Sequence, residues 1–405
     1  MSQRGRCRMV AGMNAFFREL GQTVLARWKA ENFSLAAFPA IAAGALEENP
    51  PAENVDLAAL VRDFLLEDEQ PFQTSSGFGQ PELVVYDDPR FYIQLLFWLD
   101  GTTQIHQHEF SGAFHVLAGS SLHTEFTFEN ARAVTAHFRM GDLRLKETQL
   151  LETGSTVPIV SGGACIHSLF HLEMPSLTVV VRTHSDPGTG PQFTYLPPHV
   201  AVDPFYTDAL TTRRTQLLDV LERTDDPAYA ELVLAMVTEL DLERGFFILQ
   251  NCLGPLRNLG AWEEVWEAFV AKHGELAAPI APTLDEIVWR DTLVCFRGAV
   301  EDAELRFFLA LLLNVPTRDA LFGLISERFT GDPAETVLRW AGELMEVSDL
   351  GAWILDAEFP AELGVDAEEQ ADALLEALRG LLAGEKVEPA LRETFAGSSL
   401  RALVG

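Results

Sequence analysis

The chain has 405 residues, 48% of them hydrophobic, which is enough to fill more than one core. Its 60 acidic and 29 basic residues give a net charge of −31, which would repel nucleic acid phosphates and anionic membrane surfaces. No run approaches the roughly 18 apolar residues of a membrane span, and no signal-peptide core follows the basic N-terminus. We therefore expect a soluble, cytoplasmic protein of two or three domains that binds neither nucleic acid nor membrane.

The cysteines of the chain give no sign of a disulfide framework or a zinc ribbon. They are widely scattered and include no Cys-x-x-Cys pair: Cys7, Cys165, Cys252 and Cys295. Reduced thiols in a cytosolic compartment are the simplest interpretation.

The first 75 residues are predicted to be a helical segment. Residues 15–33 and 55–68 carry apolar side chains at roughly the helical spacing of 3.6 residues. The Ala- and Pro-rich residues 38–54 are expected to join these two helices.

Residues 76–203 change character and are predicted to form a β domain. Eight short β-rich runs alternate with turns rich in Gly, Pro, Asp and Asn: 82–86, 91–99, 113–129, 143–151, 155–160, 165–173, 176–183 and 192–196. Many short strands at close spacing are typical of a sandwich or jelly roll.

Residues 204–405 are predicted to be a large all-helical domain, which makes the whole chain α+β. The amphipathic segments are 209–222, 226–240, 261–273, 302–313, 316–328, 332–346 and 366–382. No fixed sequence period relates them, so a repeat solenoid has no support. A lid over the barrel, a homodimer surface and a partner-docking domain are all compatible with this region.

Two histidines one residue apart, His106 and His108, follow the strand-like run 91–99. Side chains at i and i+2 of a strand point the same way, so both imidazoles would face one spot. A third, His167, lies in a later strand that follows a glycine turn. Three neutral imidazoles from two strands would suit Fe(II) and leave coordination positions for a substrate and O2.

These segments resemble the two motifs of the cupin superfamily, and within it the thiol dioxygenases of the cysteine dioxygenase type. The resemblance covers residues 85–200. The residues that occupy the family's signature positions are Trp98, Ile105-His106-Gln107-His108, Phe114 and Leu117-Ala118-Gly119. It implies a central double-stranded β-helix, or jelly-roll, barrel with a non-haem Fe(II) site held by His106, His108 and His167.

The sequence departs from the family in two places. Most cupins add a glutamate ligand where this chain has Gly112 or Ala113, so a site with three histidines and no carboxylate is favoured. Some cysteine dioxygenases carry a cysteine–tyrosine crosslink and a Ser-His-Tyr relay. Ala113 makes the crosslink impossible, and only Ser176 of the relay is present.

Three further residues are candidates for the catalytic site. His115 shares the parity of Ala113 and Leu117, so it either points into the barrel or is a buried structural histidine. Arg90 and Arg182 are candidates for holding a substrate carboxylate, with a solvated strand-end arginine as the alternative. His171 would lie about 13 Å along the strand from His167, too far to bind the same ion.

The function that the resemblance implies is an iron-dependent oxygenase that oxidises a small thiol or amino-acid-like molecule with O2. Two alternatives stay open at this point. One is an iron cupin that catalyses a different oxidative cleavage or rearrangement in a biosynthetic pathway. The other is a non-catalytic cupin that binds a ligand while its helical half docks a partner.

Overall fold

The computed structural model describes residues 6–66, 71–74, 77–99, 101–347, 360, 363 and 369–404. Its first helices are α1 (Arg6–Ala30), α2 (Phe38–Glu48), α3 (Pro51–Asn54) and α4 (Leu57–Leu66), with a 3-10 turn at Leu35–Ala37. The stretch that we expected only to join two helices thus forms α2 and α3. Pro39 is accommodated because it lies in the first turn of α2, and Phe38, Ala42 and Leu46 are buried.

The β region confirms the strand-rich character predicted between residues 82 and 203. Its strands are β1 (Glu82–Asp88), β2 (Phe91–Trp98), β3 (His106–His108), β4 (Gly112–Ala118), β5 (Ser121–Ala133), β6 (Phe138–Leu151), β7 (Thr156–Ile159), β8 (Gly162–His171), β9 (Ser176–Thr183), β10 (Thr194–Leu196) and β11 (Val200–Val202). One sheet has the order β1-β2-β9-β4-β7. The other, β10-β11-β6-β5-β8-β3, closes on itself because β10 also pairs with β3.

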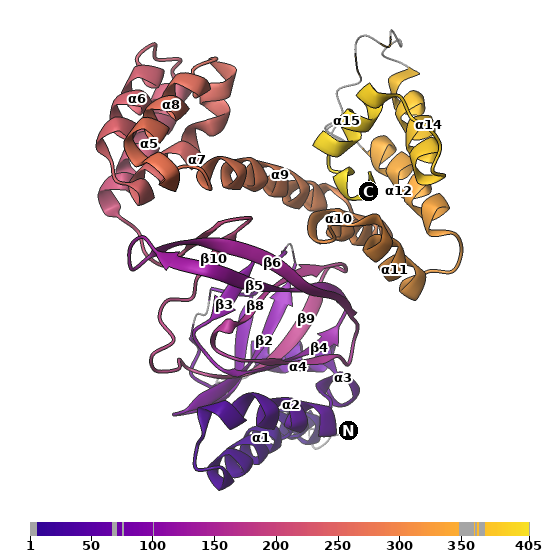
Figure 1. Cartoon of the computed structure of the whole chain (residues 1–405). Coiled ribbons are helices and arrows are strands. Elements are labelled where there is room, and N and C mark those ends of the chain that lie inside the picture. Colours follow the sequence, from indigo (N-terminus) through magenta and orange to yellow (C-terminus); the bar gives the residue numbers. More distant parts are fainter. Residues whose placement is uncertain are drawn as a thin grey trace.

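An apolar core lies between the two sheets. It contains Leu96 and Phe114 from the five-stranded sheet and Leu151 and Leu169 from the closed one. The N-terminal helices cover the outer face of the five-stranded sheet, where Phe17, Trp28 and Phe38 pack with Phe91 and Val179 (Figure 1). That sheet is therefore buried on both faces.

The helices of the C-terminal region form two lobes, each around its own hydrophobic core. The first contains α5 (Ala209–Arg223), α6 (Tyr229–Glu239), α7 (Leu242–Asn258) and α8 (Trp262–His273), and the second contains α10 (Ala303–Asn314), α11 (Arg318–Arg328), α12 (Pro333–Val347), α14 (Gln370–Leu382) and α15 (Pro389–Gly397). Helix α9 (Ile280–Ala299) joins them: Ile280 and Leu284 belong to the first core, Leu293 and Phe296 to the second (Figure 1).

Both lobes pack on the outer face of the closed sheet. Phe138 and Val200 enter the core of the first lobe, and Leu122 and Phe170 enter that of the second. The buried Arg297 of α9 also donates hydrogen bonds of 2.8 and 3.0 Å to the backbone carbonyl of His171 on β8. The helices are therefore anchored to the strand that carries His167.

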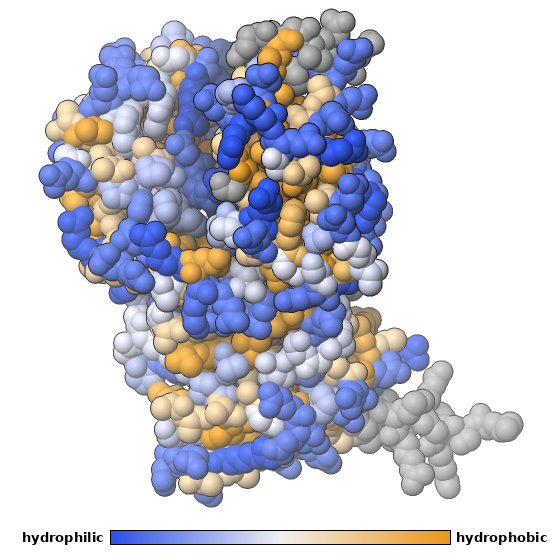
Figure 2. Space-filling view, turned by 45° about the vertical axis from the view of Figure 1, so that its right-hand side comes forward, coloured by the Kyte–Doolittle hydropathy of each residue, from blue (hydrophilic) through white to orange (hydrophobic). Residues whose placement is uncertain are grey.

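The α+β class predicted from the sequence is confirmed. On the face shown in Figure 2, hydrophilic residues cover much of the two helical lobes, with apolar residues interspersed. None of the described helices is both long and apolar enough to cross a lipid bilayer. The expected domain boundary at residues 75 and 76 lies outside the described residues, as does the start of the amphipathic segment predicted at 366. The homodimer and the cytoplasmic location stay predictions.

Candidate metal centre

The register between β3 and β8 brings the three predicted ligands together. His106 and His167 are direct partners in this antiparallel pair, so their side chains leave the sheet on the same side. His108 lies two residues along β3 and faces the same way. A bulge follows Gln107, because the partner of His108 is Gly162 rather than the residue that an unbroken ladder would supply. The bulge re-aims the end of β3 toward the site.

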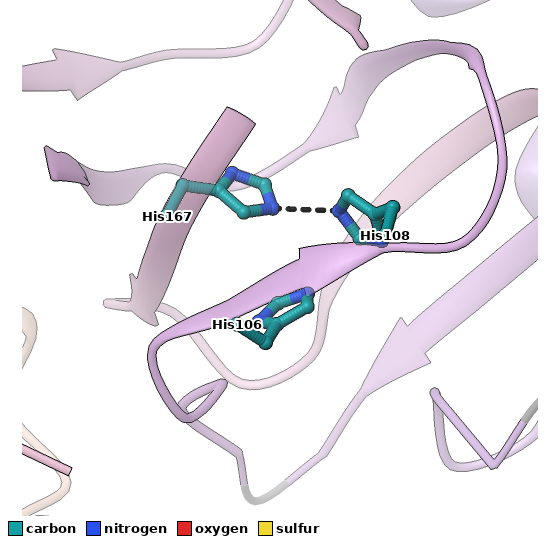
Figure 3. A group of neighbouring side chains, drawn as sticks. All are labelled: His106, His108 and His167. Atoms are coloured by element: carbon teal, nitrogen blue, oxygen red, sulfur yellow. Dashed lines mark hydrogen bonds between the residues drawn. The ribbon is translucent and has the colours of Figure 1, made fainter. Parts of the chain in front are cut away.

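The three imidazoles converge closely enough to share one ion. One nitrogen from each of the three histidines lies within 4.8 Å of the others. The Nε2 atoms of His108 and His167 are 2.8 Å apart, and Figure 3 shows these two rings pointing at each other above the strand that carries His106. All three residues are at most 6% exposed.

Neighbouring groups occupy the outer nitrogens of two of these rings. His106 donates from Nδ1 to the backbone carbonyl of Gln104 at 2.7 Å, which leaves its Nε2 lone pair available. His167 Nδ1 contacts Nε2 of His123 at 2.8 Å. His108 Nδ1 is buried and has no hydrogen-bond partner among the described residues. In metal sites, contacts such as those made by His106 Nδ1 and His167 Nδ1 fix the orientation and the tautomer of the ligand ring.

Burial keeps the cluster neutral. It lowers the pKa of His106 to about 4, against a smaller opposing effect of the Gln104 carbonyl. The pKa values of His108 and His167 are lowered well below the usual value, first by burial and then by the neighbouring imidazoles. A metal ligand must present a lone pair, and a neutral imidazole has one on one of its two ring nitrogens at neutral pH.

The donor set fits a divalent transition metal. Imidazole nitrogen suits iron, zinc, copper and nickel, and three such ligands leave positions open for water or substrate. Among the described residues, no carboxylate joins the three histidines, as expected from Gly112 and Ala113. The three histidines could therefore hold a metal ion, and their chemistry alone does not choose which one.

A narrow cavity of about 40 Å³ adjoins the imidazoles inside the barrel. Its walls are mainly aromatic and aliphatic, including Phe110, Phe114 and Leu169, and its polar side chains include Gln94, Thr178 and Arg182. An outer pocket of about 300 Å³ lies next to it, and Phe78, Trp98, Thr103 and His106 line both. Phe78 stacks on His106 with ring centroids 5.4 Å apart, so it stands between the two spaces.

Arg182 is the predicted arginine that reaches this cavity. It lies on β9, is 6% exposed, and its guanidinium carbon stands 3.4 Å from the centroid of the Phe110 ring. Nε and one terminal nitrogen donate to backbone carbonyls of Thr183 and His184, and the negative charges of Glu109, Glu82 and Asp186 also act on the guanidinium. Burial lowers the pKa of Arg182 to about 10, so it stays charged at neutral pH. A buried guanidinium in the wall of a cavity favours an anionic ligand.

The structure corrects the placement of His115. Its neighbours Ala113 and Leu117 pack in the core under the N-terminal helices, whereas Phe114 and Val116 face the barrel interior. His115 is fully buried and its Nδ1 lies 2.8 Å from Thr156 Oγ1. The expectation that it points into the barrel is wrong, and the alternative of a buried structural histidine describes it.

Arg90 also lies away from the metal centre. Its side chain is exposed, with the guanidinium carbon 4.4 Å from the Phe33 ring centroid under the N-terminal helices. Its backbone N–H donates to Asp88 at the β1–β2 turn. Arg90 is therefore an arginine exposed to solvent at a strand end, which was the alternative interpretation, whereas Arg182 is not.

His171 is neither in the cavity lining nor in the cluster of three histidines, as its distance along β8 predicts. It stacks on Trp98 with ring centroids 4.5 Å apart, and its Nδ1 is 2.8 Å from Ser121 Oγ. His123, Gln149 and Phe78 were missed by the sequence analysis. The sequence "SLHTEF" places His123 on a strand, which was the available signal. Its contact with His167, however, depends on the register between β5 and β8, which the sequence does not give.

No protein-family model matches the chain, and no curated protein matches it. It is similar to the solved structure of a cupin-2 domain protein from Shewanella frigidimarina, with 14% identity over 30% of this chain and 89% of that chain and a TM-score of 0.19. It is also similar to the structure of hydroquinone 1,2-dioxygenase from Sphingomonas sp. TTNP3, with 12% identity over 30% of this chain and 81% of that chain and a TM-score of 0.22. A third similar structure comes from a study of the DMSP lyases RdDddP and RnDddQII, with 15% identity over 42% of this chain and 95% of that chain and a TM-score of 0.23. At these values the likenesses assign neither a family nor an activity to this chain.

Proposed function

We propose that the chain is a cupin oxygenase in which His106, His108 and His167 hold Fe(II) and O2 oxidises a small anionic substrate. The observation that carries the proposal is the convergence of three neutral imidazoles within 4.8 Å at an apolar cavity. Two facing antiparallel sheets around that cavity agree with the cupin motifs of the sequence. Bound Fe(II) would supply the redox chemistry that lets a closed-shell substrate react with O2.

The residues around the imidazoles have separate roles in this proposal. Arg182 binds the anionic group of the substrate and thereby fixes its orientation toward the three histidines. Phe110 and Phe114 exclude bulk water from the reacting end. The outer pocket of about 300 Å³ holds the rest of the substrate, since the inner cavity of about 40 Å³ admits little more than a reactive group.

The substrate class follows from the resemblance and from Arg182 together. A short thiol that carries a carboxylate or a related anion suits both. A second kind of oxidation has one observation in its favour, namely that the strand with Ser176 lacks the histidine and tyrosine of the thiol dioxygenase relay. The Thr178 hydroxyl accepts a 3.1 Å hydrogen bond from Trp98 Nε1, so its oxygen is committed to the cavity wall. An oxidative carbon–carbon cleavage that needs no such relay is therefore the second candidate.

Oxygen consumption tests the proposal. The protein is purified anaerobically, loaded with Fe(II) and offered short anionic thiols, amino acids and aromatic diols in an oxygen electrode. We expect one class to drive substrate-dependent O2 uptake, no uptake by H167A, and normal uptake by H115A, whose histidine lies outside the barrel interior. Tight iron binding without O2 uptake for any class would contradict the oxygenase and favour a ligand-binding module.

A further inference from the structure

A row of hydrogen-bonding side chains leads from the metal centre across the inner face of the closed sheet. His123 on β5 is the direct strand partner of Gln149 on β6, and it lies diagonally across from His167 on β8. Gln149 Nε2 is 3.2 Å from His123 Nδ1, and His123 Nε2 is 2.8 Å from His167 Nδ1. His123 is 1% exposed, so solvent does not compete for these contacts.

The donors and acceptors of this row define a direction. When the amide nitrogen of Gln149 faces His123, His123 Nδ1 accepts from it and the His123 proton lies on Nε2, because an amide nitrogen only donates. His123 Nε2 then donates to His167 Nδ1, and His167 Nε2 carries a proton that it donates to His108 Nε2 at 2.8 Å. The row ends at His108 Nδ1–H, which is buried without a partner among the described residues. In this direction His167 offers no lone pair to a metal.

Metal binding requires the opposite direction. His167 must present the Nε2 lone pair, so its proton must lie on Nδ1 and be donated to His123 Nε2. His123 must then carry its proton on Nδ1, which needs an acceptor. Gln149 can supply one if its amide makes a half turn and brings Oε1 to face His123, because the two ends of an amide have opposite hydrogen-bonding character. No proton is gained or lost in this rearrangement.

We propose that Gln149 and His123 are positioning residues that set which nitrogen of His167 is free to bind metal. The proposal rests on the metal centre put forward above and adds to it two residues that touch neither ion nor substrate. Outer partners of this kind typically change metal affinity 10- to 100-fold when they are removed.

Substitutions at Gln149 separate this role from simple packing. A carboxylate in place of the amide would only accept, so Q149E holds the row in its metal-binding direction, whereas Q149L offers neither donor nor acceptor. We expect Q149E to bind Zn²⁺ at least as tightly as the wild type and Q149L about tenfold more weakly, measured by competition with a chromophoric chelator. Q250E, on the distant helix α7, controls for one added negative charge. Urea unfolding confirms that each variant is folded.

Imidazole ¹⁵N chemical shifts provide the readout that packing alone would not move. We expect the His123 proton to lie on Nδ1 in the Zn²⁺-loaded protein. A His123 proton on Nε2 in the Zn²⁺-loaded protein, or equal Zn²⁺ affinities for Q149E and Q149L, would overturn the positioning role while leaving the three-histidine site intact. Wild-type affinity in H167A would instead overturn the metal centre itself, so the two failures are distinguishable.

Discussion

His106 and His167 face each other directly across the β3–β8 strand pair, with their ring centroids 4.9 Å apart. A single register therefore sets two ligands, and strand alternation adds His108 as the third. A slip of one residue would turn His167 to the opposite face of the sheet. The site thus depends on strand pairing between residues about 60 positions apart in the sequence.

Arg182 is predicted to determine binding of an anionic substrate. Replacing it with methionine removes the charge but keeps an apolar chain of similar length over Phe110. We expect KM to rise roughly 30-fold, which corresponds to about 2 kcal/mol for a lost charged hydrogen bond, with a smaller change in kcat. Steady-state O2 uptake measures both constants. Arg90→Met is the matched control, and a similar rise of KM there would argue against the assignment.

Buried neutral histidines are predicted to make the metal-free protein less stable in acid. Burial lowers the pKa of His115 to about 4 and that of His171 to about 3. Below the ordinary value of 6.5 the unfolded chain takes up protons that the folded chain does not. The stability is thus complete above pH 6.5 and is lost as the pH falls toward 4 for His115 and toward 3 for His171, at about 1.4 kcal/mol per pH unit for each histidine.

His115→Asn tests this pH dependence on one residue outside the metal centre. The variant lacks one titrating group. The free energy of unfolding of the wild type should therefore fall relative to that of the variant as the pH falls from 6.5 to 4.5. Urea unfolding at several pH values gives the difference in free energy of unfolding. A difference that stays constant over this range would show that His115 is not held neutral.

Phe78 is predicted to control access to the metal centre, because it stacks on His106 and lines both the outer pocket and the inner cavity. Phe78→Ala should speed removal of bound Zn²⁺ by a chelator about tenfold, which corresponds to a free-energy barrier to release that is lower by roughly 1.4 kcal/mol. Phe205 is 66% exposed and lines the outer pocket, so Phe205→Ala is the control. Equal extraction rates in Phe78→Ala and the wild type would place the entry route elsewhere.

The helices are predicted to be needed to keep the β region soluble. A fragment of residues 77–203 would expose Leu122, Phe138, Phe170 and Val200, which the two C-terminal lobes cover. Contiguous exposed apolar area of this kind promotes association. We expect the fragment to aggregate in size-exclusion chromatography while the full chain does not. A monodisperse fragment would show that the barrel is independent of the helices.

Much of the metal centre could be predicted from the sequence because strand alternation is a local rule. His106 and His108 share a face whatever the rest of the fold does. His115 could not be placed in the same way. Strand β4 is buried on both faces, so apolar residues occupy both parities, and the sequence pattern carries no sign of which face is inward.

The remaining differences come from tertiary register and packing. The contact between His123 and His167 exists only because β5 pairs with β8, and the contact between His123 and Gln149 only because β5 pairs with β6. Residues 38–54 were expected to be a connection because of their prolines. Pro39 and Pro51 instead lie in the first turns of helices, where a missing N–H is tolerated, and burial of α2 stabilises it.

The central claim is that His106, His108 and His167 bind one metal ion together. Anaerobic titration of the purified chain with Fe(II), followed by equilibrium dialysis and metal analysis, tests it most directly. The wild type and H115A should each retain one equivalent of iron, and H106A, H108A and H167A should each lose it. Retention of a full equivalent by any of these three variants, or no retention by the wild type, would contradict the account.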